Sequence, residues 1–453
     1  MDETTRRFAA FCTTLGYADL SSNAIHAARR LMVDTVGCAV GGYHSEPARI
    51  ARRLAARTVS SPPGTVWGSG SASSLEAAAF ANGVMVRYLD FNDTYMSVEV
   101  GHPSDFIPAI LAAAESVGAS GKQAILAIVT GCEVFASLAD ACNLFRKGFD
   151  HGLYIGLGAA AGAAQVLGLD EEQTGNAIAL ACTASVPLRQ TRSGALTMWK
   201  GCAAPAAAKD GLFAALLAME GMTGPSAAFE GRHGLWDQVT GRFDPAPLGA
   251  PPALGVERTG FKYFPTEYNS LLLLELMLKL RPQVQLEEIE SIHVETYHFT
   301  YAEIGSEPAK WRPTTRETAD HSLPYMLAVL LMDGEVTVQS FSEERIRDPL
   351  LPKLMDRIYI RENDEFTAKY PHSIEGRIEV RTLAGRRVIE SGSYPLGHPR
   401  NPMSDEQLSA KYRNLCRSVM PESRAEAVLE GLWSMDQYDD IRKLTSLIRI
   451  DDL

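Results

Sequence analysis

The chain has 453 residues, of which 46% are hydrophobic and 22% charged, and its formal net charge is −12 at pH 7. These are the proportions of a globular protein with about two or three domains. The charge is spread over short acidic and basic alternations and leaves no broad basic surface, which argues against a nucleic-acid partner.

The seven cysteines indicate a reducing compartment. None of them forms a CxxC pair and most stand in Ala- and Val-rich surroundings, so we expect reduced, mostly buried thiols in a cytoplasmic protein. The N-terminal residues lead into no apolar run of the signal-peptide type, and no later stretch reaches ~18 uninterrupted apolar residues. Neither secretion nor a membrane partner is therefore expected. The cysteines are Cys12, Cys38, Cys132, Cys142, Cys182, Cys202 and Cys416.

From about Ser22 to Met222 the apolar residues recur at helical spacing. Ala dominates the helix faces, which predicts short distances between helix axes and an interlocked bundle. No repeat of ~20 to 50 residues is visible, so a solenoid is not expected. Besides a helix that begins near Ser22, helices are expected at about Leu75–Leu89, Gln123–Cys142, His151–Leu167, Glu171–Cys182 and Ala206–Glu220.

The pattern changes after the Pro- and Gly-rich segment Phe243–Gly255, a plausible surface crossover. Beyond it, alternating residues predict strands at Ile292–Glu295 and Ile358–Ile360 and a hairpin through Arg377–Glu390, with helices near Ser270–Leu280 and Leu323–Met332 and again from about Asp405. We therefore predict a mainly α fold with a smaller α+β domain. The helical domain is expected to be discontinuous (residues 1–258 and 396–453), with the α+β domain (residues 259–395) inserted into it.

The segment from Asp90 to Asp105 gathers acids, a hydroxyl and an imidazole beside helix-breaking residues. Asp90, Asp93 and Thr94 are followed closely by His102. Pro103 can open a helix over Ser104–Ala114, whose first-turn amides would attract an anion. Asp and Thr can also serve only as caps and turn formers here. The cluster as a whole favours proton transfer.

Other polar groups stand in Gly-rich or apolar loops of both predicted domains. His151 precedes a helix of Gly and Ala, which it either caps or serves chemically. Arg192 and Lys200 suit a polyanionic small molecule, although solvated loop charges are the ordinary alternative. Lys200 is flanked by Trp199 and an apolar segment, so we expect its amine in a pocket. The remaining candidates are Lys262 and Glu267 at the domain junction, His321 and Tyr325 before a predicted helix, and His398. Polar loop ends from two domains are typical of a cleft.

Several classes of site lack their motifs. The ten histidines show no HxH, HExxH or Cys–His spacing, so no metal site is predicted. No GxGxxG lies between a strand and a helix, no P-loop occurs, and no GxSxG surrounds a serine, so neither a nucleotide cofactor nor a serine hydrolase is expected. Acid–base chemistry on an anion remains.

Five motifs of the chain resemble the MmgE/PrpD family, and the similarity extends over nearly the whole sequence. They are Leu89–Tyr95, Gly101–Asp105, Thr191–Gly194, Met198–Lys200 and Phe264–Tyr268. The resemblance implies a large helical domain formed by the N-terminal part and the C-terminal tail, a smaller α+β lid domain, and commonly a homodimer. Its members include 2-methylcitrate dehydratase, cis-aconitate decarboxylase and iminodisuccinate epimerase.

Carried over by position, the resemblance implies active-site roles for Asp90, Thr94, His102, His151, Lys200 and Tyr325. One position separates two branches of the family. Where the decarboxylases carry a histidine in the Phe-Pro-x-His motif, this chain has Glu267, as do the dehydratases. The spacing between Thr94 and His102 also resembles the dehydratases. The resemblance therefore implies a hydro-lyase, with a decarboxylase or an epimerase of a small polycarboxylate as the alternative and a non-catalytic binding or scaffold protein as a third reading.

For such a reaction we expect His102, oriented by Asp90 or Asp93, to transfer one proton, and His151 or Lys200 to transfer the other or to screen the developing charge. Which group is acid and which is base stays open. No metal or other cofactor is expected, because cationic side chains and amides can carry the electrostatic load. The expected partner is a di- or tricarboxylate, and the expected substrate-binding residues are Asp93, Thr94, Arg192, Lys262, Glu267, His321 and Tyr325.

Overall fold

A computed structural model describes residues 1–250 and 253–450, so the predicted crossover Phe243–Gly255 is described except for residues 251 and 252. Helices dominate and the strands form small sheets, as predicted. The chain divides into two compact units. The larger unit contains Met1–Thr191, Gly201–Gly260 and Ser404–Leu453, and the smaller contains Arg192–Lys200 and Phe261–Met403.

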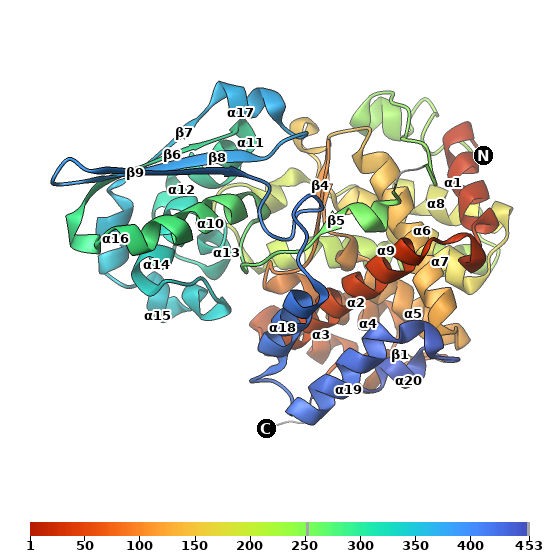
Figure 1. The fold of residues 1–453 in the computed structure, drawn as a ribbon. Coiled ribbons are helices and arrows are strands. Elements are labelled where there is room, and N and C mark those ends of the chain that lie inside the picture. Colours follow the sequence, from red (N-terminus) through yellow and green to blue (C-terminus); the bar gives the residue numbers. More distant parts are fainter. Residues whose placement is uncertain (251–252, 451–453) are drawn as a thin grey trace. The chain divides into compact units, whose positions relative to one another are not determined.

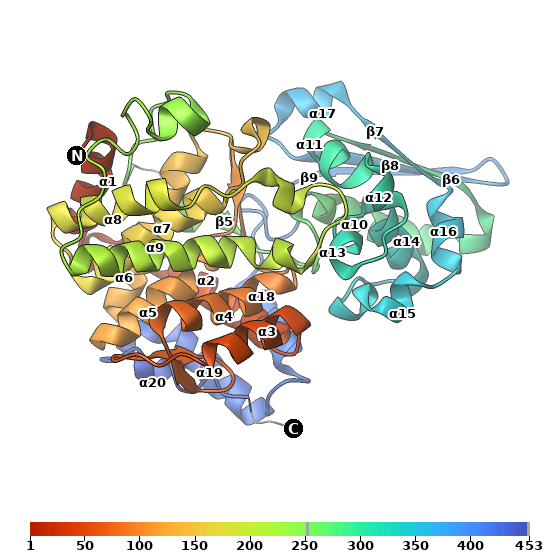
Figure 2. The same cartoon turned by 180° about the vertical axis from the view of Figure 1, so that it is seen from behind.

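The larger unit is a helical bundle built around α7, which packs against α6, α8 and α9 (Figure 2). Two glycine contacts explain why small residues fill these helices. A side chain at Gly131 of α6 would lie 2.8 Å from the carbonyl oxygen of Gly158 in α7, and one at Gly211 of α9 would lie 2.2 Å from that of Gly156. The backbones therefore approach more closely than any larger residue would allow. The long helices here are α1 (Glu3–Thr14), α2 (Ser22–Gly42), α3 (Glu46–Ala55), α4 (Leu75–Tyr88), α5 (Ile107–Val117), α6 (Gly121–Ala139), α7 (Gly152–Leu167), α8 (Glu171–Ala184) and α9 (Ala203–Met219).

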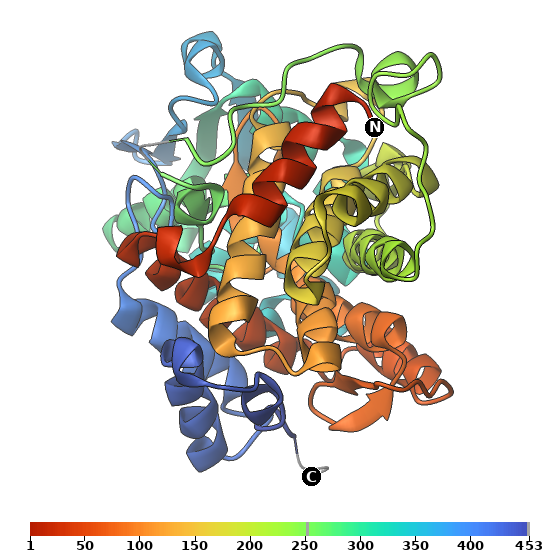
Figure 3. The same ribbon diagram turned by 90° about the vertical axis from the view of Figure 1, so that its right-hand side faces the viewer.

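Helices from both ends of the chain complete this unit. The first helix, α1, packs against α7 and α8 (red in Figure 3). Near the other end, α18 (Asp405–Cys416) and α19 (Glu422–Trp433) pack against α2. The ammonium of Lys411 in α18 binds the carboxylate of Asp34 and the main-chain oxygen of Phe91, each at 2.6 Å. The C-terminal segment thus anchors the loop that follows α4.

Short strands were not predicted in the larger unit, yet one small sheet lies in the region of the Asp90–Asp105 cluster. β3 (Thr94–Met96) pairs antiparallel with β4 (Val100–Gly101) on one side and β5 (Thr259–Gly260) on the other. A two-stranded sheet of β1 (Gly64–Val66) and β2 (Ser71–Ser73) lies elsewhere in the unit. These strands are only two or three residues long, too short to give a readable alternation.

The smaller unit contains a four-stranded sheet in the order β7-β6-β8-β9 (Figure 1). β6 (Ile289–Thr296) is parallel to β7 (Ile358–Glu362) and antiparallel to β8 (Glu375–Thr382), which forms the predicted hairpin with β9 (Arg387–Ser393). α10 (Leu271–Leu280) packs on β8 and β9 and contacts α14 (Leu323–Asp333). The predicted strands and helices of this region are confirmed.

Burial accounts for two further features. All seven cysteines are buried free thiols, as predicted. Among the described residues, α6 is long and apolar enough to cross a membrane, but 89% of its apolar window is buried inside the protein. Such burial is typical of a core helix.

Candidate active site

The hairpin of β3 and β4 brings Thr94 and His102 together. Tyr95 pairs with Gly101, so the residue after β4 returns to the start of β3. The hydroxyl of Thr94 lies 3.3 Å from Nδ1 of His102. Gly101 is required here, because a side chain would lie 2.5 Å from the buried ring of Phe135. Local strand pairing therefore fixes the imidazole beside the threonine.

His102 is bound at both ring nitrogens. Its Nδ1 lies 2.6 Å from the main-chain oxygen of Asp93, and its Nε2 lies 3.1 Å from Nη2 of Arg87. Arg87 lies in the last turn of α4, is 2% exposed, and pairs through Nη1 with the carboxylate of Asp90. Asp90 therefore reaches His102 through Arg87. Asp90 also takes a left-handed backbone conformation (φ 53°) at the turn out of α4.

Asp93 orients His102 with its carbonyl group, while its carboxylate has another role. The carboxylate oxygens accept the amide of Ser104 at 3.2 and 3.3 Å. Burial raises the pKa of Asp93 well above its usual value, and the nearby Asp34 and Asp105 raise it further, against the hydrogen bonds from Ser104. The predicted helix over Ser104–Ala114 was wrong at its start, because a short 3-10 turn (Pro103–Asp105) precedes α5 at Ile107. The Ser104 amide expected to attract an external anion is bound by Asp93.

His151 lies next to His102. It is the N-cap residue of α7, and its ring centroid is 5.5 Å from that of His102 at an interplanar angle of 72°. Its Nδ1 lies 4.0 Å from a carboxylate oxygen of Asp150, which also accepts the amide of Gly152 at 3.0 Å. The larger unit therefore holds two buried imidazoles side by side.

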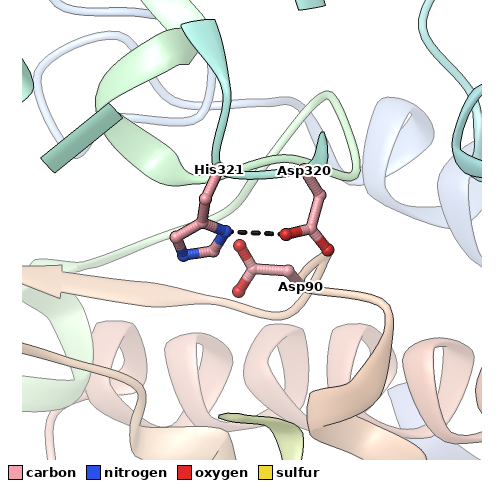
Figure 4. Close-up of side chains that lie close together, drawn as sticks. All are labelled: Asp90, Asp320 and His321. Carbon is pink, nitrogen blue, oxygen red and sulfur yellow. Dashed lines mark hydrogen bonds and ion pairs between the residues drawn. The ribbon is translucent and has the colours of Figure 1, made fainter. Parts of the chain in front are cut away.

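The smaller unit contains a second polar group, centred on Asp320. Its carboxylate lies 3.4 Å from Nζ of Lys200, 2.7 Å from Nδ1 of His321 and 3.1 Å from Nη1 of Arg316 (the His321 contact is drawn in Figure 4). Burial raises the pKa of Asp320, but Lys200, His321 and Arg316 outweigh it, so the pKa lies below the usual value. Lys200 and His321, far apart in the sequence, thus share one buried carboxylate.

The other candidates of this unit lie in different surroundings, and Glu267 is only partly buried. Glu267 donates its amide to the main-chain oxygen of Asp320 at 3.0 Å, while its carboxylate accepts the main-chain and side-chain nitrogens of Asn269 at 2.8 and 2.6 Å. The hydroxyl of Tyr325 donates to the main-chain oxygen of Ser340 at 2.7 Å. Burial raises the pKa of Tyr325. Arg192 and Lys262 are also buried.

Sequence reasoning missed Arg87, Asp320 and Arg316 as members of these groups. The two arginines had a signal: Arg87 is a cation at the end of an apolar helix, three residues before an acid, and Arg316 stands four residues before Asp320. Spacings of three or four residues can bring opposite charges together along or at the end of a helix. Asp320 directly precedes His321, which the sequence did single out.

Comparison with known proteins places the chain in a family. The model of the MmgE/PrpD N-terminal domain matches residues 6–248, and that of the MmgE/PrpD C-terminal domain matches residues 264–437. The chain belongs to the MmgE/PrpD family. It is 30% identical to 2-methylcitrate dehydratase of Escherichia coli (92% of this chain, 91% of the relative) and 29% identical to the mitochondrial 2-methylcitrate dehydratase of Yarrowia lipolytica (93% and 86%). It is 26% identical to human cis-aconitate decarboxylase (98% and 94%).

Proposed function

We propose that the protein is a hydro-lyase that removes water from a 2-methylcitrate-like tricarboxylate by acid–base catalysis. The observation that carries the proposal is the pair of buried imidazoles, His102 and His151, in a chain related over 92% of its length to 2-methylcitrate dehydratase. Paired titratable groups in unlike surroundings are typical of acid–base sites. Here one imidazole contacts an arginine and the other lies beside an aspartate.

The reaction needs two unequal proton transfers. A base takes the weakly acidic proton from a carbon next to a carboxylate, and the electron pair moves into that carboxylate. The carbon–carbon double bond then forms as the hydroxyl leaves, protonated to water by an acid. His102 is one proton-transfer group and His151 or Lys200 the other, and Lys200 can instead screen the charge that develops on the carboxylate.

Substrate binding requires cations and hydroxyls. Arg192, Lys262 and Lys200 are the buried cations assigned to the carboxylates, with Thr94, Asp93, His321 and Glu267 as further polar contacts. Tyr325 would have to exchange its hydrogen bond to Ser340 for one to the substrate. We assign no metal or other cofactor to this scheme.

The direct test is an assay of the purified full-length protein with 2-methylcitrate after treatment with a chelator. Formation of the unsaturated acid, unchanged by the chelator, is the expected result. Citrate and simple dicarboxylates serve as matched substrates that lack the methyl group or one carboxylate. Absence of water loss from every polycarboxylate would overturn the proposal.

The second candidate is a cis-aconitate-type decarboxylase, which the 26% identity to the human enzyme over 98% of the chain supports. Glu267, which stands where the decarboxylases carry a histidine, favours the dehydratase. Release of carbon dioxide would identify the decarboxylase, and loss of optical rotation without exchange of water would identify an epimerase. A non-catalytic binding protein would give neither product yet gain thermal stability with polycarboxylates.

The proposal also covers the domain arrangement and the assembly of the protein. We propose that the three-segment helical unit and the strand-containing unit act as a discontinuous large domain and a lid, in a cytoplasmic homodimer. Light scattering of the eluting protein gives the mass of the assembly. A mass of 49.2 kDa would contradict the dimer.

A further inference from the structure

A buried arginine contacts the ring of His102. A guanidinium with 2% exposure requires partners, and Arg87 has Asp90 through Nη1 and His102 through Nη2, with Asp105 3.7 Å from its Nε. The ion pair with Asp90 neutralises the charge of Arg87. The contact with the uncharged ring of His102 is not needed for that neutralisation, so it must have another role.

The contact determines which nitrogen of His102 carries the proton. A guanidinium can only donate, so Nε2 must accept from Nη2, 3.1 Å away. Nδ1 then carries the proton and donates to the main-chain oxygen of Asp93 at 2.6 Å. The hydroxyl of Thr94 donates to the same oxygen at 2.8 Å. All these contacts are satisfied by the neutral Nδ1–H tautomer, assigned here from the hydrogen-bond network.

We propose that Arg87 is a positioning residue that holds His102 as the neutral Nδ1–H tautomer and thereby makes it the base of the reaction. This inference rests on the proposed function. In the reaction Nη2 yields its place at Nε2 to the substrate, and Nε2 takes the proton from the carbon next to the carboxylate. If His102 were protonated, its Nε2–H would point at the N–H of Nη2 of Arg87, and the two donors would repel each other. The contact therefore opposes protonation of His102 before the substrate binds. The acid must then be another group, which leaves His151 or Lys200.

Charged and titratable groups from several elements of the larger unit contact His102 or its partner Arg87. They are Arg87 of α4, Asp90 and Asp93 of the following loop, Asp105 of the 3-10 turn and His151 of α7. The carboxylates favour an imidazolium and the guanidinium disfavours it. Loss of Arg87 should therefore raise the pKa of His102 and move the acidic limb of kcat/KM to higher pH.

The test uses the full-length protein with Arg87→Ala, together with Arg52→Ala as a control, because Arg52 donates to the main-chain oxygen of Tyr43 elsewhere in the same unit. We expect kcat to fall on the order of 100-fold for Arg87→Ala, with KM changed much less. Added guanidinium should restore part of kcat and return the pH limb. A fall in kcat with neither the shift nor the rescue would overturn the inference, as would full activity.

Nitrogen-15 spectra of the histidine-labelled wild-type protein separate this inference from the proposed function. The protonated nitrogen of His102 should be Nδ1, and the preference should disappear in Arg87→Ala. A proton on Nε2 of the wild type would contradict the role of Arg87 whatever the protein catalyses. A wild type with the expected tautomer and no dehydratase activity would contradict the proposed function.

A separate observation concerns Lys310 of the smaller unit, in α12 (Pro308–Trp311). Its side chain is 1% exposed, and among the residues that the structure describes its ammonium makes no hydrogen bond or ion pair. Burial lowers its pKa, while Glu307, Glu303, Asp320 and Glu267 act in the opposite direction from a distance. A buried ammonium without a bonded partner destabilises a protein.

We infer that Lys310 binds a carboxylate of the substrate, which again rests on the proposed function. Asp320 is already bound by Lys200, His321 and Arg316, and Glu307, Glu303 and Glu267 act on Lys310 only from a distance, so we assign it a partner from outside the chain. A cation kept buried and unpaired at a cost in stability is typical of a binding site. Lys310 would add a contact that the sequence did not assign.

Two readouts test this role with Lys310→Met, and Lys353→Met of α16 (Leu350–Met355) is the exposed control. We expect the ligand-free variant to be as stable as the wild type or more stable, because an unpaired buried charge has been removed. Its thermal shift with 2-methylcitrate should be lost, and KM should rise about tenfold while kcat changes less. A destabilised ligand-free variant, or an unchanged KM, would overturn the inference. A wild type that no polycarboxylate stabilises would count against the proposed function instead.

Discussion

The two polar groups of the molecule are built in opposite ways. In the larger unit, His102 is held by a main-chain oxygen and by Arg87, and its ring lies against another imidazole. In the smaller unit, one carboxylate, Asp320, collects a lysine, a histidine and an arginine. In our proposal the first arrangement sets which ring nitrogen carries a proton, whereas the second gathers cationic side chains around one carboxylate.

This difference suggests a division of work. A neutral imidazole can exchange protons near neutral pH, whereas ammonium and guanidinium groups around a carboxylate keep their charge. We therefore expect substitutions in the first group to act on proton transfer. Substitutions in the second should act on both electrostatics and folding.

The largest effect is expected for His102→Ala. Loss of a proton-transfer group should reduce kcat about 10²- to 10⁴-fold, because the methyl group of alanine cannot accept the proton. His102→Asn is the conservative companion, since its amide can still donate to the oxygen of Asp93 while lacking a base. Steady-state kinetics on folded variants measure the effect, and His293→Ala, on the β6 strand, should behave like the wild type. Undiminished turnover in either His102 variant would remove His102 from the scheme.

The next effect is expected for Asp320→Asn, which leaves Lys200, His321 and Arg316 without their shared carboxylate. The pKa of Asp320 is lowered in the folded protein, so its charge contributes stability above the unfolded pKa, and this contribution is lost as pH falls through the folded pKa. At neutral pH the variant should lose about 3 to 5 kcal/mol of unfolding free energy. Denaturant unfolding at pH 7 and pH 3 measures it. An equal loss at both values would contradict the electrostatic explanation.

Most of the fold could be predicted because its elements are long enough to show a period. Helices such as α4 and α10 and the β8–β9 hairpin lie within a few residues of the expected ranges. The β3–β4 hairpin could not be predicted, because its strands span two or three residues and its register depends on Phe135 of α6. Helix α5 begins later than expected, because Pro103–Asp105 forms a 3-10 turn before it.

The candidate residues could be chosen from the sequence, but their partners could not. His102 and His151 stand out by type, yet their contact depends on the packing of α7 against the 3-10 turn. Sequence reasoning named Asp90 or Asp93 as the residue that orients His102, but it could not show that the contacts are the main-chain oxygen of Asp93 and the guanidinium of Arg87. Main-chain acceptors carry no signal in residue type, so only coordinates reveal them.

The smallest expected effect concerns Glu99, which fixes the loop before His102 in the larger unit. It lies in the loop between β3 and β4, and its carboxylate accepts the amides of Leu144 and Phe145 at 2.5 and 3.0 Å. Its own amide donates to the oxygen of Ala139 at 2.8 Å. The loop before His102 is thereby tied to the segment between α6 and His151. Burial raises the pKa of Glu99 to about 7, against the hydrogen bonds from these amides.

The pH dependence of this contact has a definite sign. Because the folded pKa lies above the unfolded value of about 4.3, the contribution of Glu99 to stability is full below pH ~4 and is lost as pH rises through about 7. Relative to Glu99→Gln, the wild type should lose roughly 3 to 4 kcal/mol between pH 4 and pH 8. The unfolding free energies of both proteins across this pH range test the prediction. The change of their difference with pH is the measure, and it does not depend on how stable each protein is at any one pH. Parallel curves would show that Glu99 stays ionised throughout, and the hairpin of His102 would then be tied by a permanent charge.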